Sequence, residues 1–104
     1  MHVTMQRYEG IDHGRRDELK RKVDETFMPK LNDLPGFNGY FLIDAGNGVM
    51  SSISLFETSA QAEESTRVAS TWVREEKLNE ILPNPPKVTV GEVLLTKTNG
   101  AFRA

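Results

Sequence analysis

Two polar side chains in the first segment of the chain could bind a small molecule through hydrogen bonds. Gln6 and Tyr8 lie two residues apart in the β-favouring stretch 2–8, and alternate residues of a strand project from the same face. A glutamine amide donates and accepts hydrogen bonds, as does a phenol, so the pair could orient a phenolate or another oxyanion. A tyrosine near a strand end could equally bury its ring and leave its hydroxyl in water.

Trp72 is the only tryptophan and falls in the helical stretch 58–77. It could form the wall of an apolar ligand site, or it could be a core anchor that packs the helix on a sheet. Gln6, Tyr8 and Trp72 are therefore the candidates for a catalytic role. Arg67, on the same stretch, could compensate an anionic ligand, although its i,i+4 spacing from Glu63 favours a surface ion pair.

Small and aromatic residues indicate where a ligand would have room. Ser52 and Ser54 share one face of the predicted strand 49–56. With an even-length turn before that strand, Phe37 and Phe41 are predicted on the same face, whereas Tyr40 is predicted on the opposite face, toward a partner subunit. The pocket candidates are Phe37, Phe41, Ser52, Ser54 and Arg67.

The composition excludes several kinds of chemistry. The chain has no cysteine, which rules out disulfides, thiolate nucleophiles and iron–sulfur clusters. Its two histidines, His2 and His13, stand at the chain start and at a helix entrance, and no His, Asp or Glu cluster has ligand spacing, so we expect neither a metal nor a cofactor. No Gly-x-Ser-x-Gly nucleophile motif is present, and "AGNGV" lies in a hairpin instead of a phosphate loop.

Charge and hydropathy narrow the partners further. The net charge of −2 lacks the basic excess of a nucleic-acid-binding protein. No segment approaches the ~20 apolar residues of a membrane span, and the N-terminus lacks the pattern of a signal peptide. We expect a cytoplasmic protein that contacts neither nucleic acid nor membrane.

The pattern of apolar residues predicts the elements that position these side chains. Period-two segments predict strands over 2–8, 37–44, 49–56 and 88–96, and a three-to-four period predicts helices over 12–34 and 58–77. Pro29 should kink the first helix, Asn47-Gly48 suits a type I′ turn, and Thr58 with Gln61 suits a capping box. A single domain over 1–97 would leave 98–104 as a tail, either loose or reaching a neighbour.

The order βαββαβ predicts a ferredoxin-like α+β fold. Right-handed crossovers place both helices on one face of a four-stranded antiparallel sheet. The strands 37–44 and 49–56 are apolar on both faces, and each large apolar side chain left in water forfeits ~1.5–3 kcal/mol. The simplest cover for the second face is a second copy of the sheet, which predicts a homodimer.

Local motifs carry a family resemblance over about residues 2–96. "PGFNGYFL" after an amphipathic helix, then "VMSSISLFE", "TSAQAEES", "WVRE" and an "LPNPP" loop resemble the antibiotic biosynthesis monooxygenase superfamily of dimeric α/β barrels, in particular its small uncharacterised bacterial members. The resemblance implies the fold and the dimer. Members include cofactor-independent monooxygenases of polycyclic aromatic phenols, haem degraders, isomerases and decarboxylases. Haem-degrading relatives place a histidine ligand on the second helix, and this chain has none between Ser59 and Leu78.

Three functions remain open on the sequence. The first is a cofactor-independent monooxygenase, or an isomerase-like enzyme, that acts on a small aromatic or enolisable compound. The second is a non-catalytic dimeric module for small-molecule binding or stress response. The third is a structural dimer whose pocket is filled by its own side chains. The lack of a histidine-centred constellation favours the last two, and a cavity lined by Gln6, Tyr8 or Trp72 would favour the first.

Overall fold

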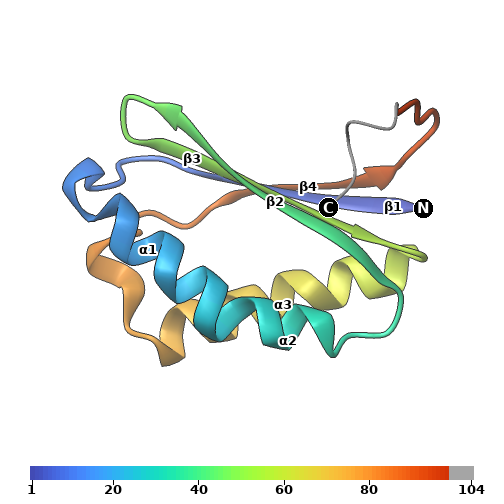
Figure 1. Ribbon diagram of the computed structural model, residues 1–104, viewed down its shortest axis with the longest axis horizontal. Coiled ribbons are helices and arrows are strands. Elements are labelled where there is room, and N and C mark those ends of the chain that lie inside the picture. The colour runs from blue at the N-terminus through green and yellow to red at the C-terminus, as the bar shows by residue number, and fades with distance from the viewer. Residues whose placement is uncertain (99–104) are drawn as a thin grey trace.

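One sheet and two helical segments make up the fold of the computed structural model, which describes residues 1–98 (Figure 1). The strands are all antiparallel and lie in the order β2-β3-β1-β4. They are β1 (His2–Tyr8), β2 (Phe37–Gly46), β3 (Val49–Phe56) and β4 (Lys87–Glu92). The helical elements are η1 (His13–Arg15), α1 (Arg16–Lys22), η2 (Val23–Phe27), α2 (Met28–Asn32), α3 (Ser59–Glu75) and η3 (Leu78–Glu80).

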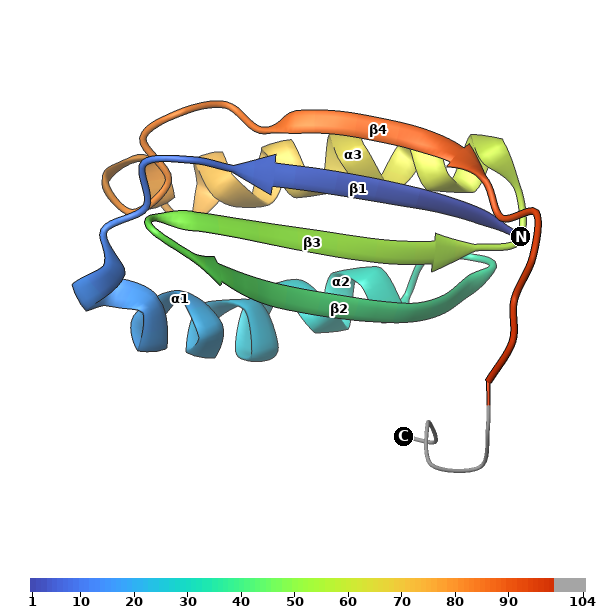
Figure 2. The same cartoon turned by 90° about the horizontal axis from the view of Figure 1, so that it is seen from above.

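Both helical segments cover the same face of the sheet, so the predicted ferredoxin-like α+β fold is confirmed. Seen from above, α1 and α2 follow the β2 edge, and α3 lies under β1 and β4 (Figure 2). The core lies between these two layers and is apolar, with Leu31, Phe56 and Ala62 fully buried. Residues 99–104 of the predicted tail lie outside the described residues.

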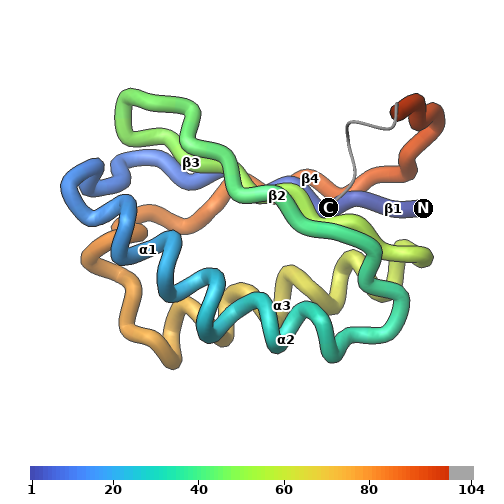
Figure 3. The backbone as a smooth tube through the Cα atoms, viewed as in Figure 1, coloured from blue at the N-terminus to red at the C-terminus, as the bar shows by residue number. Residues whose placement is uncertain are grey.

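The first helical segment changes its winding before Pro29. Val23–Phe27 forms a π-helical turn, and Pro29 stands in the first turn of α2. Proline has no N–H to donate to the carbonyl of Glu25, and a wider turn absorbs this interruption. The trace nevertheless runs on from α1 into α2 (Figure 3). The predicted apolar stripe survives, because Leu19, Val23 and Phe27 are all buried.

The second helix begins as the sequence predicts. Thr58 Oγ1 accepts from the backbone N–H of Gln61 at 3.2 Å, and Gln61 Oε1 accepts from the backbone N–H of Thr58 at 3.1 Å. This reciprocal capping box satisfies two N–H groups that have no partner inside the helix. The helix ends at Glu75, slightly before the predicted boundary.

Tyr40 and Phe41 of β2 project from the opposite faces of the sheet to those predicted from the sequence. Asn47 and Gly48 adopt the positive φ values, 54° and 75°, that a tight hairpin turn requires. The ladder, however, is irregular between Asp44 and Gly46, where Ala45 is an extra residue. Such a bulge shifts the register by one residue, so Tyr40 lies opposite Ser54 and Phe41 lies opposite Ile53. The predicted inward position of Phe41 and outward position of Tyr40 were both wrong.

The last strand is shorter than predicted. β4 ends at Glu92, and the chain then leaves the sheet (Figure 2). The backbone N–H of Val93 still donates to the carbonyl of Met1 at 2.9 Å. Leu94 and Leu95, which the prediction placed in the strand, are 87% and 89% exposed. Among residues 1–98, no helix has the length and apolar character needed to cross a membrane.

Candidate functional site

A small cavity of about 30 Å³ lies between the sheet and the helices. Its sheet side is built from the inward faces of β1, β2 and β3, and its helix side from α1, η2 and α3. Five residues singled out in the sequence line it, namely Gln6, Tyr8, Ser52, Ser54 and Trp72. A cavity needs ~10–15 Å³ on this measure to hold one water, so the space admits about two waters and no aromatic ring.

Gln6 and Tyr8 form a hydrogen-bonded pair on the sheet side of the cavity. The Tyr8 hydroxyl donates to Oε1 of Gln6 at 2.8 Å, and Gln6 is only 6% exposed. The strand period predicts this shared face. Within residues 1–98 the amide nitrogen of Gln6 has no hydrogen-bond acceptor. The pair therefore leaves one N–H₂ donor available in a wall that has hydroxyl groups but no charged side chain.

Both tyrosines of the chain line this cavity, and their phenols stay protonated. Burial raises the pKa of Tyr8 to about 12. Burial also raises the pKa of Tyr40 above its ordinary range, and a hydrogen bond with Ser52 opposes that increase. Because the charged form is disfavoured in a dry site, neither phenol can serve as a base near neutral pH. The single phenolic proton of Tyr8 is already donated to Oε1 of Gln6, so Tyr8 orients that amide and does not donate to a ligand oxyanion.

Trp72 forms part of the helix wall and is held from two sides. Its indole N–H donates to Oγ1 of Thr26 at 2.7 Å, and its ring packs on Phe27 with centroids 4.7 Å apart. The Thr26 hydroxyl in turn donates to the carbonyl of Lys22 at 2.7 Å. Trp72 is thus a core anchor and a wall of the cavity at once, because it is 4% exposed and lines the open space.

The small polar side chains of the wall differ in what they bind. Ser52 hydrogen-bonds the Tyr40 phenol. Ser65 donates to the carbonyl of Ala62 at 2.6 Å, and the Thr4 hydroxyl donates to the same carbonyl at 2.9 Å. Ser54 is 6% exposed and has no such partner among the described residues. Ser54 and the Gln6 amide are therefore the polar groups left over for a ligand.

Three pocket candidates from the sequence lie elsewhere. Phe37 packs on Phe56, with ring centroids 5.7 Å apart, and does not line the cavity. Phe41 is on the opposite face of the sheet and 38% exposed, because of the bulge at Ala45. Arg67 is exposed on the outer side of α3 and pairs with Glu64, one residue after the predicted partner Glu63.

Among the other lining residues, Tyr40, Leu42 and Ser65 were not predicted as pocket residues from the sequence. Tyr40 and Leu42 reach the cavity only because of the bulge, where Gly46 has a positive φ and its N–H donates to Oδ1 of Asp44 at 2.9 Å. Ser65 could have been found, since it stands four and seven residues before Ala69 and Trp72 on the same helical stripe.

The wall contains no side chain that is charged at neutral pH. None of the lining residues is Asp, Glu, His, Lys or Arg, and no group of three or more His, Cys, Asp or Glu within residues 1–98 could hold a metal ion. The site offers hydrogen bonds, an aromatic wall and exclusion of water. It can orient a ligand and stabilise an oxyanion, and a proton must leave through solvent or the ligand itself.

Two larger hollows adjoin the cavity and share walls with it. The α1–β2 groove, about 640 Å³, lies between α1, η2, α2 and β2 and shares Val23, Tyr40 and Leu42 with the cavity. The proline groove, about 260 Å³, is lined largely by residues 82–86 and shares Gln6, Tyr8 and Leu82 with the cavity. The cavity therefore lies between the two grooves and shares part of its wall with each.

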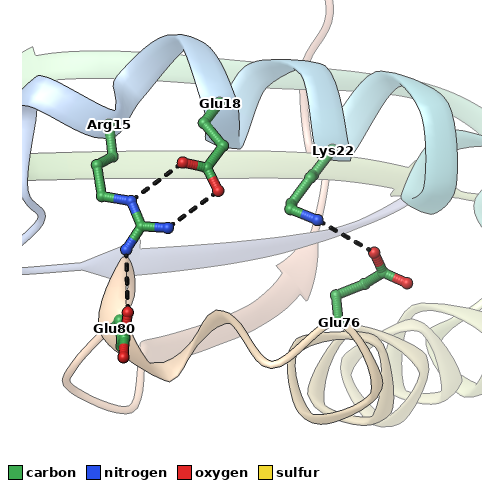
Figure 4. A network of polar contacts seen from close by, with 5 residues as sticks. All are labelled: Arg15, Glu18, Lys22, Glu76 and Glu80. Atoms are coloured by element: carbon green, nitrogen blue, oxygen red, sulfur yellow. Dashed lines mark hydrogen bonds and ion pairs between the residues drawn. The ribbon is translucent and has the colours of Figure 1, made fainter.

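Ion pairs fasten the first helix to the end of the second (Figure 4). Arg15 contacts Glu18 at 3.0 Å and Glu80 at 3.3 Å, and Lys22 contacts Glu76 at 3.6 Å. Each such pair near the surface contributes ~0–1 kcal/mol. Together they resist separation of α1 from α3 and η3.

Comparisons with known proteins support the fold. A scan of protein-family models and a search of curated proteins both found no match. Solved structures do match. The heme degrader MhuD from Mycobacterium tuberculosis, with two hemes bound in its active site, aligns with 17% identity and a TM-score of 0.71 over 94% of this chain and 100% of that chain. The monooxygenase ActVA-Orf6 of Streptomyces coelicolor, in complex with nanaomycin D, aligns with 19% identity and a TM-score of 0.64 over 91% and 92%.

A third structure bears the name antibiotic biosynthesis monooxygenase and aligns with 15% identity and a TM-score of 0.66 over 91% of this chain and 100% of that chain. Identities this low establish the fold alone. The chain therefore has the ferredoxin-like fold of these monooxygenases, and the fold that the sequence resemblance implied is confirmed.

Haem does not fit the residues of this cavity. His2 and His13 are the only histidines of the chain, and neither lines the space. The wall from α3 presents Ser65, Ala69 and Trp72, none of which is an axial ligand of haem iron. We therefore propose no haem-dependent reaction for this chain.

Proposed function

We propose that the chain binds a small phenolic or enolisable aromatic compound in this cavity and oxidises it with dioxygen without a cofactor. The observation that supports the proposal best is the buried Gln6–Tyr8 pair, which presents an unused amide donor in a cavity that Trp72 also lines. Neutral donors in a dry site stabilise an oxyanion more than water does, because they are already oriented. The fold shared with named monooxygenases agrees with this assignment.

The reaction that fits such a site begins with ionisation of the ligand. The phenol or enol loses a proton to solvent, and the Gln6 amide holds the resulting oxyanion. In an anthrone-type ligand, the carbanion form then transfers an electron to dioxygen, and the resulting radical and superoxide combine to form the carbon–oxygen bond of a hydroperoxide at the activated methylene. One oxygen atom remains as a carbonyl, and the other leaves as water with the two methylene hydrogens. The protein supplies orientation and a water-excluding wall.

A non-catalytic binding module is the second candidate. It is favoured by the lack of any charged side chain in the wall, since acid–base catalysis normally adds 10²–10⁴-fold to a rate. The two candidates predict the same ligand class and differ only in turnover.

Oxygen uptake separates the two candidates. Purified protein, without added metal or cofactor, is incubated with a panel of hydroquinones and anthrones in an oxygen electrode. We expect uptake above the spontaneous rate with one dioxygen consumed per anthrone, and a loss of that excess in Gln6→Leu. If no compound raises oxygen uptake above background but calorimetry detects binding, the protein is a binding module and the proposed monooxygenase activity is rejected.

We further propose that two copies associate through the outer face of the sheet. Met5, Phe41 and Ile43 project from that face and are 38–41% exposed. Burying each such side chain gains ~1.5–3 kcal/mol relative to exposure. A second copy supplies a matching apolar sheet, because a two-fold axis pairs the same surface with itself.

A further inference from the structure

The cavity adjoins two larger grooves, and a ligand could enter it from either one. This inference rests on the proposed function, since it assumes that an aromatic compound binds in the cavity. The space of about 30 Å³ cannot hold a ring, so a wall residue must move. Tyr40 is the largest side chain shared by the cavity and the α1–β2 groove. Leu82 and Tyr8, which is held by its hydrogen bond to Gln6, are shared by the cavity and the proline groove.

Tyr40 is more movable than Leu82. It is partly buried, and side-chain contacts hold it, namely an edge contact with Phe27 at 5.8 Å and the hydrogen bond with Ser52. Rotation of its ring needs no backbone change, because a strand residue has more than one accessible χ1 rotamer. The groove beyond it, about 640 Å³, is within the size range of small-molecule sites.

Leu82 is fixed more firmly. It is 6% exposed, and its backbone N–H donates to the carbonyl of Leu78 at 2.7 Å. The loop that follows contains Pro83, Pro85 and Pro86, whose φ angles are fixed by their rings. Asn84 also ties this loop to the carbonyl of Glu9 at 3.1 Å.

The third route, separation of the helices, is opposed by the ion pairs of Figure 4. Opening the helix side would break the Arg15–Glu80 and Lys22–Glu76 contacts together. Rotation of Tyr40 breaks one hydrogen bond and one ring contact and leaves these ion pairs in place.

We propose that Tyr40 is the gate of the site, that an aromatic ligand enters from the α1–β2 groove, and that the ring of Tyr40 determines which ligands are admitted. With the gate closed, the cavity admits only molecules of water size, and Gln6 is otherwise reached from the proline groove that it also lines. With it open, the cavity and the groove become one elongated site, and the groove carries the charged residues Asp17, Lys20, Arg21 and Asp24. The structure thus favours a ligand that is longer than one ring, with its hydroxyl at Gln6.

The test compares Tyr40→Ala with Leu82→Ala, the matched substitution on the side of the proline groove. Binding of 1-naphthol, a neutral two-ring phenol, is followed by quenching of Trp72 in stopped flow and by calorimetry. We expect Tyr40→Ala to raise the association rate about tenfold, because the wild-type ring must leave its rotamer and its hydrogen bond. Leu82→Ala should change that rate less than about twofold.

Ser52→Ala keeps the Tyr40 ring and removes its hydrogen-bond partner, so it tests the gate without opening a hole in the core. An increase in the association rate supports the gate. Circular dichroism and thermal melting of each variant exclude loss of folding as the cause. Acceleration by Leu82→Ala alone, or unchanged rates in all three variants, would overturn the gate.

Oxygen uptake is measured on the same samples. Normal uptake with unchanged association rates would reject the gate and leave the oxidation standing. Faster association in Tyr40→Ala and Ser52→Ala without uptake in any variant would support the gate and count against oxidation.

Discussion

The Tyr8 phenol donates a 2.8 Å hydrogen bond to Oε1 of Gln6, two residues earlier on the same face of β1. This bond fixes which end of the Gln6 amide faces Tyr8 and leaves the nitrogen end for a ligand. The Tyr8 hydroxyl thereby orients the Gln6 amide, and the N–H₂ group of that amide becomes a hydrogen-bond donor with a fixed direction.

Replacement of Gln6 by Leu should therefore affect function and stability together. Oxygen uptake should fall about 10²-fold, as when one oxyanion donor is removed. The protein should also lose ~1–3 kcal/mol, since the buried Tyr8 hydroxyl has lost its acceptor. Oxygen consumption and urea unfolding measure the two effects. Tyr8→Phe is the control, because it keeps the amide donor and should retain more activity, and equal losses in both variants would contradict this role for Gln6.

Alkaline titration should reveal the buried phenols. The pKa of Tyr8 is raised from 10.0 to about 12, so the folded state keeps its proton where the unfolded state loses it. The stability that this adds is fully present below pH 10 and is lost as pH rises toward about 12. Phenolate absorbance should thus appear well above pH 10, and urea unfolding should show falling stability there. Tyr8→Phe should flatten that fall, and an ordinary titration of both tyrosines would refute their burial.

Thr26 should be required for the position of Trp72. Thr26→Val removes the acceptor of a 2.7 Å hydrogen bond from a buried indole N–H, which should cost ~1–3 kcal/mol. Thr26→Ser keeps the hydroxyl and should restore most of the stability. Urea unfolding followed by Trp72 emission measures both. If the two variants are equally stable, the hydrogen bond contributes nothing and the valine merely fills the same space.

Gly36 and Gly46 offer a matched pair of backbone positions. Both have positive φ, +76° and +80°, but a Cβ on Gly36 would lie 1.9 Å from Oε1 of Gln61, whereas a Cβ on Gly46 meets nothing within 4 Å. Gly46→Ala should cost ~1–2 kcal/mol from the left-handed backbone alone. Gly36→Ala should cost a further ~0.5–2 kcal/mol, because Gln61 must leave the capping box. Thermal unfolding compares the two, and equal costs would mean that Gln61 moves away without loss.

The outer face of the sheet should determine assembly. Ile43→Asp places a charge in the proposed interface and should convert a dimer into a monomer, because a buried unpaired charge is strongly disfavoured. Sedimentation equilibrium measures the mass. Arg67→Glu, on the outer side of α3, is the control and should leave the mass unchanged. A wild-type monomer at micromolar concentration would reject the dimer outright.

Local chemistry made most of the fold predictable. The Asn47-Gly48 turn and the Thr58 capping box each depend on neighbouring residues alone, and both are present. The pairing of Gln6 with Tyr8 likewise follows from the strand period. These features need no knowledge of distant contacts.

The missed parts of the site follow from the bulge in β2. The prediction of an even-length turn left out Ala45 as an extra residue, although Gly46 beside it has a positive φ and its N–H donates to Oδ1 of Asp44 at 2.9 Å. Tyr40 was therefore assigned to the wrong face and Phe41 to the cavity. Arg67 illustrates a milder ambiguity, since partners three and four residues away are both within reach on a helix. It pairs with Glu64.

Because Ala45 is an extra residue, the sequence of β2 is compatible with two pairing registers against β3. If Ala45 joined the ladder, Phe41 and Ile43 would turn inward and Tyr40 outward, and both sets are apolar enough to be buried. β2 is an edge strand bonded only to β3, so a slip would disturb a single ladder. Deletion of Ala45 would leave the pairing from Gly39 to Asp44 as it is and abolish the alternative. One alanine thus decides whether the strand turns its phenol or its phenylalanine toward the interior.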